Sequence, residues 1–213
     1  MHCIDVDKGV SAIIASQLEN DFERITSHLN HRPTEKINVK IYPNLQSFHA
    51  AVNHQLGSEW FVGEAESGEI RMVTPLNPGP KHTFATILST AVHEFTHLII
   101  DEITDQELPA WLDEGIAGYE SSQRQPQFIA TQIDSSLPNI ADLNFNSGTE
   151  SNVIYAFSYT VIEFIVQKFG YDHVVKLVAN EGNFEEVLSM SEEEFEQAWQ
   201  EFIIAEYSQF QED

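Results

Sequence analysis

The chain has 213 residues, of which 42% are hydrophobic, and this length and composition predict one domain with a sizeable core. Its 34 acidic residues against 10 basic ones give a formal net charge of −24. This charge argues against binding to nucleic acid or to an anionic membrane, because the phosphates of both would be repelled, and it favours neutral or cationic peptides as partners. The single cysteine excludes an intramolecular disulfide.

The sequence was compared with the features of membrane spans and signal peptides to predict the location of the protein. No apolar run approaches the roughly 20 residues of a membrane span, and residues 1–8 lack the basic and apolar regions of a signal peptide. One cysteine also suits a reducing compartment. We therefore expect a cytoplasmic location, with secretion as the alternative if a leader has been trimmed. A salt-adapted cytoplasm would also suit the acidic excess, and the sequence indicates no oligomeric state.

The first part of the chain predicts one helix and a small sheet. Apolar residues recur on one face of residues 10–29, which is typical of an amphipathic helix. Residues 37–42 alternate as a half-buried strand that ends at Pro43. Residues 60–65 and 69–74 are predicted to form a hairpin around residues 66–68.

A long helix is predicted next, and it carries the most informative motif. Thr83 is suited to the N-cap, and the helix-compatible run continues to Asp101. His93 and His97 are four residues apart, so they share a helical face and can reach one metal ion. Glu94 lies beside this pair, where a general base for a metal-activated water belongs. The helix is apolar nearly all round, so both histidines are expected to be largely buried. The alternative is two core histidines bonded to backbone carbonyls.

A second helix, predicted over residues 109–120 with Pro109 in its first position, offers a third metal ligand. Glu114 shares a face with mostly small residues, so another helix could approach closely, and a carboxylate there needs a cation as partner. That cation could be a metal, or instead an Arg or Lys. Asp101 is the rival third ligand because it continues the His93–His97 face, whereas Asp113 is interpreted as a first-turn helix charge.

The pattern H-E-x-x-H followed by Trp-Leu-Asp-Glu-Gly-Ile-Ala resembles the gluzincins, and most closely the bacterial peptidase MA-like domains. This resemblance implies one Zn²⁺ per chain, held by His93, His97 and Glu114, with Glu94 as the general base. A metzincin site is excluded, because positions 100 and 103 are both Ile where Gly and His are needed. In thermolysin-like relatives an acidic residue supports a zinc histidine at the position that is Gly118 here.

The resemblance also covers the flanking segments. In gluzincins a strand of the region 60–74 is the sheet edge along which an extended peptide binds. An apolar helix is predicted over residues 151–169, and in peptidase MA-like domains the corresponding helix begins with a Tyr that faces the metal. The resemblance implies this role for Tyr155, with Tyr159 as the alternative, and we expect Tyr155 to be buried. Residues 123–148 are predicted to be irregular.

The sequence therefore predicts an α+β fold, a single zincin-like domain over residues 1–213. Residues 1–82 are expected to hold the N-terminal helix and sheet, and residues 83–213 the zinc helix and a mostly helical part.

The predicted function is a zinc-dependent peptidase that acts on a peptide or protein substrate. An endopeptidase is favoured over an aminopeptidase, since residues 63–67 match the aminopeptidase motif G-x-M-E-N only in part. The first alternative is a zinc-bound but weakly active peptide-binding module. It remains an alternative because Gly118 stands where thermolysin-like relatives have the acidic residue that supports a zinc histidine. The second is a metal-free interaction domain.

Overall fold

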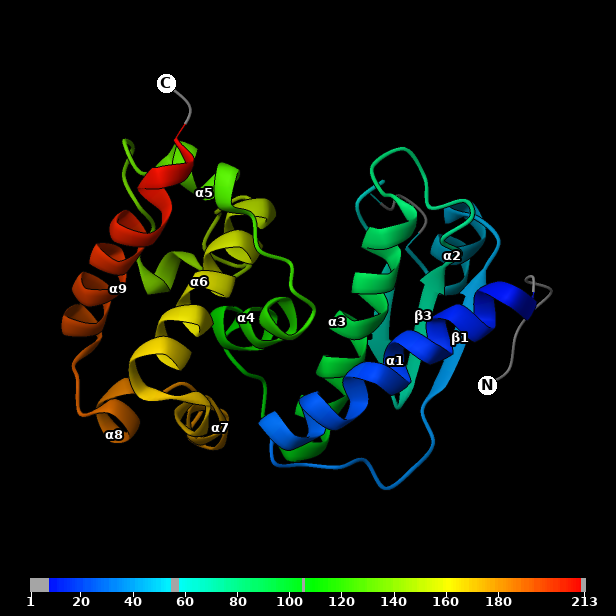
Figure 1. Ribbon diagram of the computed structural model, residues 1–213, viewed down its shortest axis with the longest axis horizontal. Coiled ribbons are helices and arrows are strands. Elements are labelled where there is room, and N and C mark those ends of the chain that lie inside the picture. The colour runs from blue at the N-terminus through cyan, green and yellow to red at the C-terminus, as the bar shows by residue number, and fades with distance from the viewer. Residues whose placement is uncertain (1–7, 55–57, 105, 212–213) are drawn as a thin grey trace. The chain divides into compact units, whose positions relative to one another are not determined.

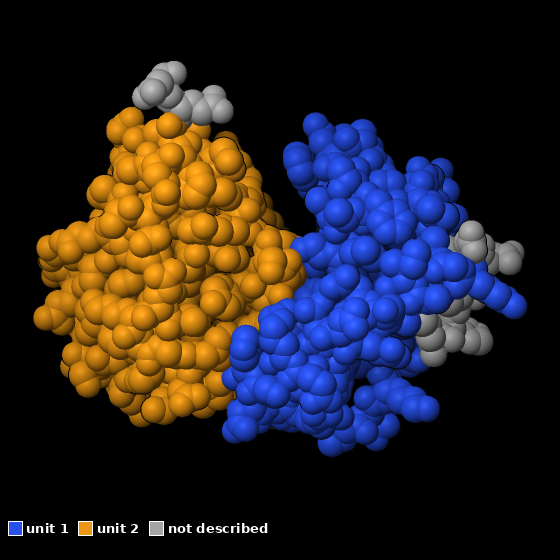
Figure 2. Space-filling model, in the orientation of Figure 1, with its two compact units in different colours: residues 1–102 blue, residues 103–213 orange. Residues whose placement is uncertain are grey.

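A computed structural model describes residues 8–54, 58–104 and 106–211. The chain divides into two compact units, residues 1–102 and 103–213 (Figure 2). Residues 1–7, to which most of the signal-peptide prediction refers, lie outside the described residues. The predicted single domain over residues 1–213 stays a prediction, and each unit is described by itself below.

The first unit contains a three-stranded sheet with the strand order β1-β3-β2. Strand β1 (Asn38–Tyr42) pairs in parallel with β3 (Glu69–Val73), and β2 (Gly63–Glu66) pairs with β3 in antiparallel orientation. The predicted hairpin is confirmed, and both residues of its turn have positive φ angles, Ser67 at 53° and Gly68 at 76°. Such angles fit a type I′ turn, whose twist matches that of the paired strands. Since β3 is central, β1 and β2 are the two edge strands of the sheet in the described part of the chain.

The two faces of this sheet differ in character. The first face is apolar and fully covered, with four buried residues from β1 and β3: Val39, Ile41, Ile70 and Met72. The second face carries Lys40, Arg71 and Glu64 in one cross-strand row. Helix α2 (Leu45–Ala51) covers the end of this second face, where the ring of Phe48 lies 6.0 Å from that of Tyr42.

Helices α1 (Lys8–His28) and α3 (Phe84–Ile103) form the helical layer of the first unit (Figure 1). They meet at Phe22 and Phe95, whose ring centroids are 5.9 Å apart. The predicted start of α3 is confirmed, because the Thr83 hydroxyl accepts a hydrogen bond from the Thr86 N–H at 3.2 Å. Satisfying that amide fixes where the helix begins.

All the regular elements in the described part of the second unit are helices. Its elements are α4 (Ala110–Glu120), α5 (Pro126–Gln132), η1 (Ile140–Asp142), α6 (Ser151–Phe169), α7 (Tyr171–Ala179), α8 (Phe184–Leu188), α9 (Glu192–Tyr207) and η2 (Ser208–Phe210). Together with the sheet of the first unit, these helices are consistent with the predicted α+β fold.

Three predictions made from the sequence can be compared with the structure of this unit. The helix over residues 151–169 is confirmed, and it ends at Gly170 with a φ of 90°. The prediction that residues 123–148 are irregular is wrong in part, since α5 and η1 interrupt an otherwise irregular stretch. Pro109 is the residue before α4 rather than its first residue, because its ψ of 139° is extended.

Helix α4 lies very close to α6. A methyl group added at Gly115 would be 2.6 Å from the Ser158 carbonyl oxygen, so only glycine permits this approach. Trp111 of α4 stacks on Phe184, which in turn stacks on Phe195 with ring centroids 4.0 Å apart. These contacts fix α4 on the core of its unit, and they explain why a helix with so many small residues is stable here. None of the described helices combines the length and apolar character needed to cross a bilayer.

Candidate metal centre

The two histidines of α3 face one another. Their Nε2 atoms are 3.0 Å apart, and their ring centroids are 4.7 Å apart at an interplanar angle of 76°. His93 is buried, with 8% of its surface exposed, whereas His97 is half-buried. The prediction of largely buried histidines is therefore confirmed for His93, and His97 is more accessible than expected.

The geometry of this pair suits a shared metal ion. One N–H could donate to the other ring nitrogen at 3.0 Å, but two nitrogen ligands of a tetrahedral Zn²⁺ would also lie about 3.3 Å apart, given Zn–N distances of about 2.0–2.1 Å. The alternative considered from the sequence was that both histidines bond backbone carbonyls. It does not account for the observed contact between the two Nε2 atoms. The donor set of two imidazoles therefore fits a metal site.

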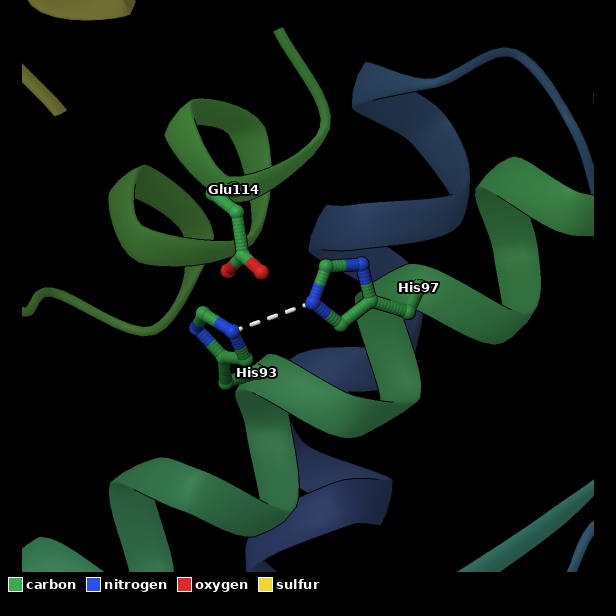
Figure 3. A group of neighbouring side chains, drawn as sticks. All are labelled: His93, His97 and Glu114. Carbon is green, nitrogen blue, oxygen red and sulfur yellow. Dashed lines mark hydrogen bonds between the residues drawn. The ribbon is translucent and has the colours of Figure 1, made fainter. Parts of the chain in front are cut away.

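Figure 3 shows Glu114 with the two histidines, its carboxylate directed toward their rings. One oxygen of Glu114 and one nitrogen from each of His93 and His97 all lie within 4.8 Å of one another. Within the described part of the chain, these three residues are the group of His, Cys, Asp and Glu side chains suited to hold a metal ion. The rival ligand Asp101 does not belong to this group and is exposed.

Glu94 is buried, with 9% of its surface exposed, and it lies against the edge strand of the sheet. A methyl group at Gly63 of β2 would be 3.1 Å from Glu94 Oε1 and 2.6 Å from the Thr90 methyl carbon. Only glycine therefore lets the backbone of β2 approach this carboxylate so closely. In the sequence, Gly63 drew attention only as part of the partial aminopeptidase motif. An isolated glycine inside a predicted strand was the signal for a close backbone approach.

The outer edge of β2 presents main-chain groups beside this glutamate. The Val73 N–H donates to the Val62 carbonyl at 2.9 Å, so residues 62 and 73 form a hydrogen-bonded pair. Since such pairs alternate along antiparallel strands, the N–H and C=O groups of Gly63 and Ala65 point away from β3, toward the open edge. An extended chain could pair there as an additional strand.

The two candidate tyrosines of α6 are in different surroundings. Tyr155 is 38% exposed and its ring lies 5.8 Å from that of Phe145, so the expectation that it is buried is wrong. It lies in the first turns of α6, before the helix enters the core of the unit. Tyr159 is buried beside Gly118 and Tyr119. Burial, followed by the nearby carboxylate of Glu163, raises the pKa of Tyr159 to about 12.

Comparison with known proteins identifies a family for this chain. A family model described as the Peptidase MA superfamily matches residues 19–205, and no curated protein matches the chain. The matched residues include both histidines, Glu94, Glu114 and the sheet edge. The chain, matched over most of its length, belongs to the Peptidase MA superfamily and has a peptidase-like fold.

Proposed function

We propose that this protein is a zinc-dependent peptidase of the gluzincin type that cleaves internal peptide bonds. The observation that carries the proposal is the grouping of His93, His97 and Glu114, whose ligand atoms lie within 4.8 Å of one another. Two imidazoles and a carboxylate are the ligand set of a catalytic zinc site that keeps one position for water or substrate. When bound, Zn²⁺ would lower the pKa of water toward about 7 and polarise the substrate carbonyl.

Glu94 and Tyr155 are the residues proposed to act on the reacting atoms. Glu94 accepts a proton from the attacking water while the water oxygen bonds to the carbonyl carbon. It then delivers that proton to the leaving nitrogen as the C–N bond breaks. The phenol of Tyr155 donates a hydrogen bond to the oxyanion that forms from the carbonyl.

The substrate is proposed to bind as a strand along the outer edge of β2. The main-chain groups of Gly63 and Ala65 point toward that edge, and Gly63 lies beside Glu94. Pairing would therefore hold the scissile bond near the proposed base. Pairing of main-chain groups makes no demand on the ends of the substrate, which is consistent with an endopeptidase.

The surroundings of Glu66 also favour an endopeptidase. This residue occupies the acidic position of the partial aminopeptidase motif, and an aminopeptidase needs an unpaired anionic group to bind the charged amino terminus of its substrate. Here the Glu66 carboxylate accepts a hydrogen bond from Arg71 Nη1 at 3.1 Å. A carboxylate that is already paired with a guanidinium is poorly suited to a second cation.

Metal content tests the proposed ligands. Purified protein is expected to carry about one zinc per chain, and His93→Ala, His97→Ala and Glu114→Ala should each weaken zinc binding strongly. Because histidine ligands must be neutral, zinc should also be released as the pH falls through the imidazole range. An unchanged zinc affinity of Glu114→Ala would show that Glu114 is not the third ligand and would favour Asp101 in that role. Purified protein without zinc would instead support the alternative of a metal-free interaction domain.

Cleavage of a degenerate peptide library tests the reaction itself. The zinc-loaded wild type should cleave internal bonds, and Glu94→Gln should not. Zinc-loaded protein that binds peptides but does not cleave them would instead support the weakly active peptide-binding module.

A further inference from the structure

We propose that Glu64 makes this protein selective for peptides with a lysine or arginine at one position near the scissile bond. This inference rests on the proposed binding of an extended peptide along β2. Glu64 lies next to Gly63, the residue beside the proposed base Glu94, and its side chain is on the opposite face of the sheet from Gly63. The residue thus belongs to the edge strand without touching the metal ligands.

The register of the sheet shows which substrate side chain would meet Glu64. Lys40, Arg71 and Glu64 are direct cross-strand partners on β1, β3 and β2, so they form one row with the charges plus, plus and minus. A peptide paired in antiparallel orientation with Gly63 and Ala65 has one residue directly opposite Glu64. That pair is of the non-hydrogen-bonded kind, in which the side chains are closest. The side chain of this substrate residue is therefore the next member of the row.

The basic residues of the row only partly neutralise Glu64. Arg71 Nε bonds Glu69 at 2.8 Å and Arg71 Nη1 bonds Glu66 at 3.1 Å, whereas the nearest approach of Arg71 to Glu64 is 3.6 Å, too long for a hydrogen bond. Glu64 Oε2 is buried and accepts no hydrogen bond from the described residues. Lys40 is paired with Glu69 at 2.7 Å. Because its ion pair with Arg71 is long and includes no hydrogen bond, Glu64 gains more from an added cation than a carboxylate that already accepts charge-assisted hydrogen bonds.

The partial burial of Glu64 also favours the binding of a cation by its carboxylate. Its side chain is 29% exposed, against 59% for Glu66, so a charge on Glu64 is less screened by water. Burial is the largest influence on Glu64 and raises the pKa of its carboxyl, which a cation at contact distance would reverse. The guanidinium of Arg71 reaches to 3.6 Å from Glu64, so a bound cation would share this carboxylate with it, while Glu66 and Glu69, which bond Arg71, offset its charge.

Matched peptides and two glutamate variants test the inference. Wild-type cleavage of the degenerate library would define each position around the scissile bond, and peptides with Lys, Arg, Gln or Met at each position would then be compared by kcat/KM. At one position the peptides with Lys or Arg should have a kcat/KM about fivefold higher than the peptide with Gln. This ratio corresponds to about 1 kcal/mol for an opposite-charge cross-strand pair. Glu64→Gln should remove this preference by slowing only the basic peptides. Glu66→Gln, on the same strand and face, should retain it.

The same peptides separate this inference from the proposed reaction. Their affinities for zinc-loaded Glu94→Gln and Glu94→Gln/Glu64→Gln proteins, measured by fluorescence anisotropy, need no turnover. Selective binding of basic peptides that depends on Glu64, without cleavage by the wild type, would support the inference and overturn the peptidase. A preference that survives Glu64→Gln, or equal binding and cleavage of basic and neutral peptides at every position, would overturn the inference alone.

Discussion

Two glutamates of this protein are buried to the same degree in helices of similar composition. Glu94 of α3 is 9% exposed and Glu163 of α6 is 8% exposed. Both helices are largely apolar, so a carboxylate on either would be costly if it were not compensated. What differs is the kind of group around each carboxylate.

Glu163 is enclosed by groups from its own unit. The Tyr207 hydroxyl donates to Glu163 Oε2 at 2.6 Å, and Arg124 Nε lies 3.2 Å from Oε1. Arg124 also donates to the Tyr207 hydroxyl at 3.1 Å, and its guanidinium lies over the Tyr207 ring. The three side chains tie α6 and α9 to the segment before α5. We infer that this arrangement is structural, because each of its polar groups is bonded within the unit.

Glu94 lies instead at the edge of the sheet. Its carboxylate packs against the backbone of Gly63, on the strand whose outer edge is open, and His93 precedes it in α3. Burial alone therefore does not distinguish the proposed catalytic base from a structural carboxylate. The position beside an open strand edge and a pair of facing imidazoles does.

The largest effect is expected from Glu94→Gln. The amide keeps the size of the side chain but cannot accept the proton of the attacking water, so kcat should fall at least about a hundredfold. Zinc content and the melting temperature should change little, because Glu94 is not a proposed ligand. Turnover near the wild-type rate would show that Glu94 is not the base.

A smaller loss of kcat is expected from Tyr155→Phe. An oxyanion donor acts mainly in the transition state, so kcat should fall at least about tenfold while KM and the melting temperature stay close to wild type. Tyr159→Phe is the matched comparison on the same helix, since its phenol is buried beside Gly118 and Tyr119. A large loss of kcat in Tyr159→Phe alone would transfer the role to Tyr159.

The opposite phenotype is expected from Glu163→Gln. This change removes the charge that faces Arg124 and Tyr207, and it should lower the free energy of unfolding by about 1–3 kcal/mol. The kcat of the folded variant should equal that of the wild type. Urea unfolding and active-site-normalised kinetics measure the two quantities, and a large fall in kcat with unchanged stability would contradict the structural role of Glu163.

The sequence predicted most accurately what depends on near neighbours along the chain. The Thr83 cap and the apolar period placed α3, and the spacing of His93 and His97 placed both imidazoles on one face. The hairpin followed from Ser67-Gly68, since few residue pairs adopt two positive φ angles in succession. These features are local, so no tertiary information was needed.

Features that depend on distant contacts were only partly predicted. Glu114 and Asp101 were both open as third ligands, because helical spacing cannot show which carboxylate meets the histidines. The exposure of Tyr155 was missed because the apolar character of residues 151–169 as a whole hides the more accessible first turns of the helix. The approach of Gly63 to Glu94 joins residues 31 positions apart, and nothing in either segment specifies the other.

The smallest effect is expected at alkaline pH, in the unit that contains Glu163. Burial, followed by Glu163, raises the pKa of Tyr159 to about 12 and also raises that of Tyr207. In the unfolded chain tyrosine titrates near 10, so the unfolded state releases its protons first. The stability that these neutral phenols contribute is therefore fully present below pH 10 and is lost as the pH rises toward 12.

Urea midpoints at pH 8, 9, 10 and 11 should fall over the last two values, and less steeply in Tyr159→Phe. Glu163→Gln should reduce this fall only in part, because burial is the larger cause. A midpoint that stays constant from pH 9 to 11 would show that neither phenol is held protonated by the fold.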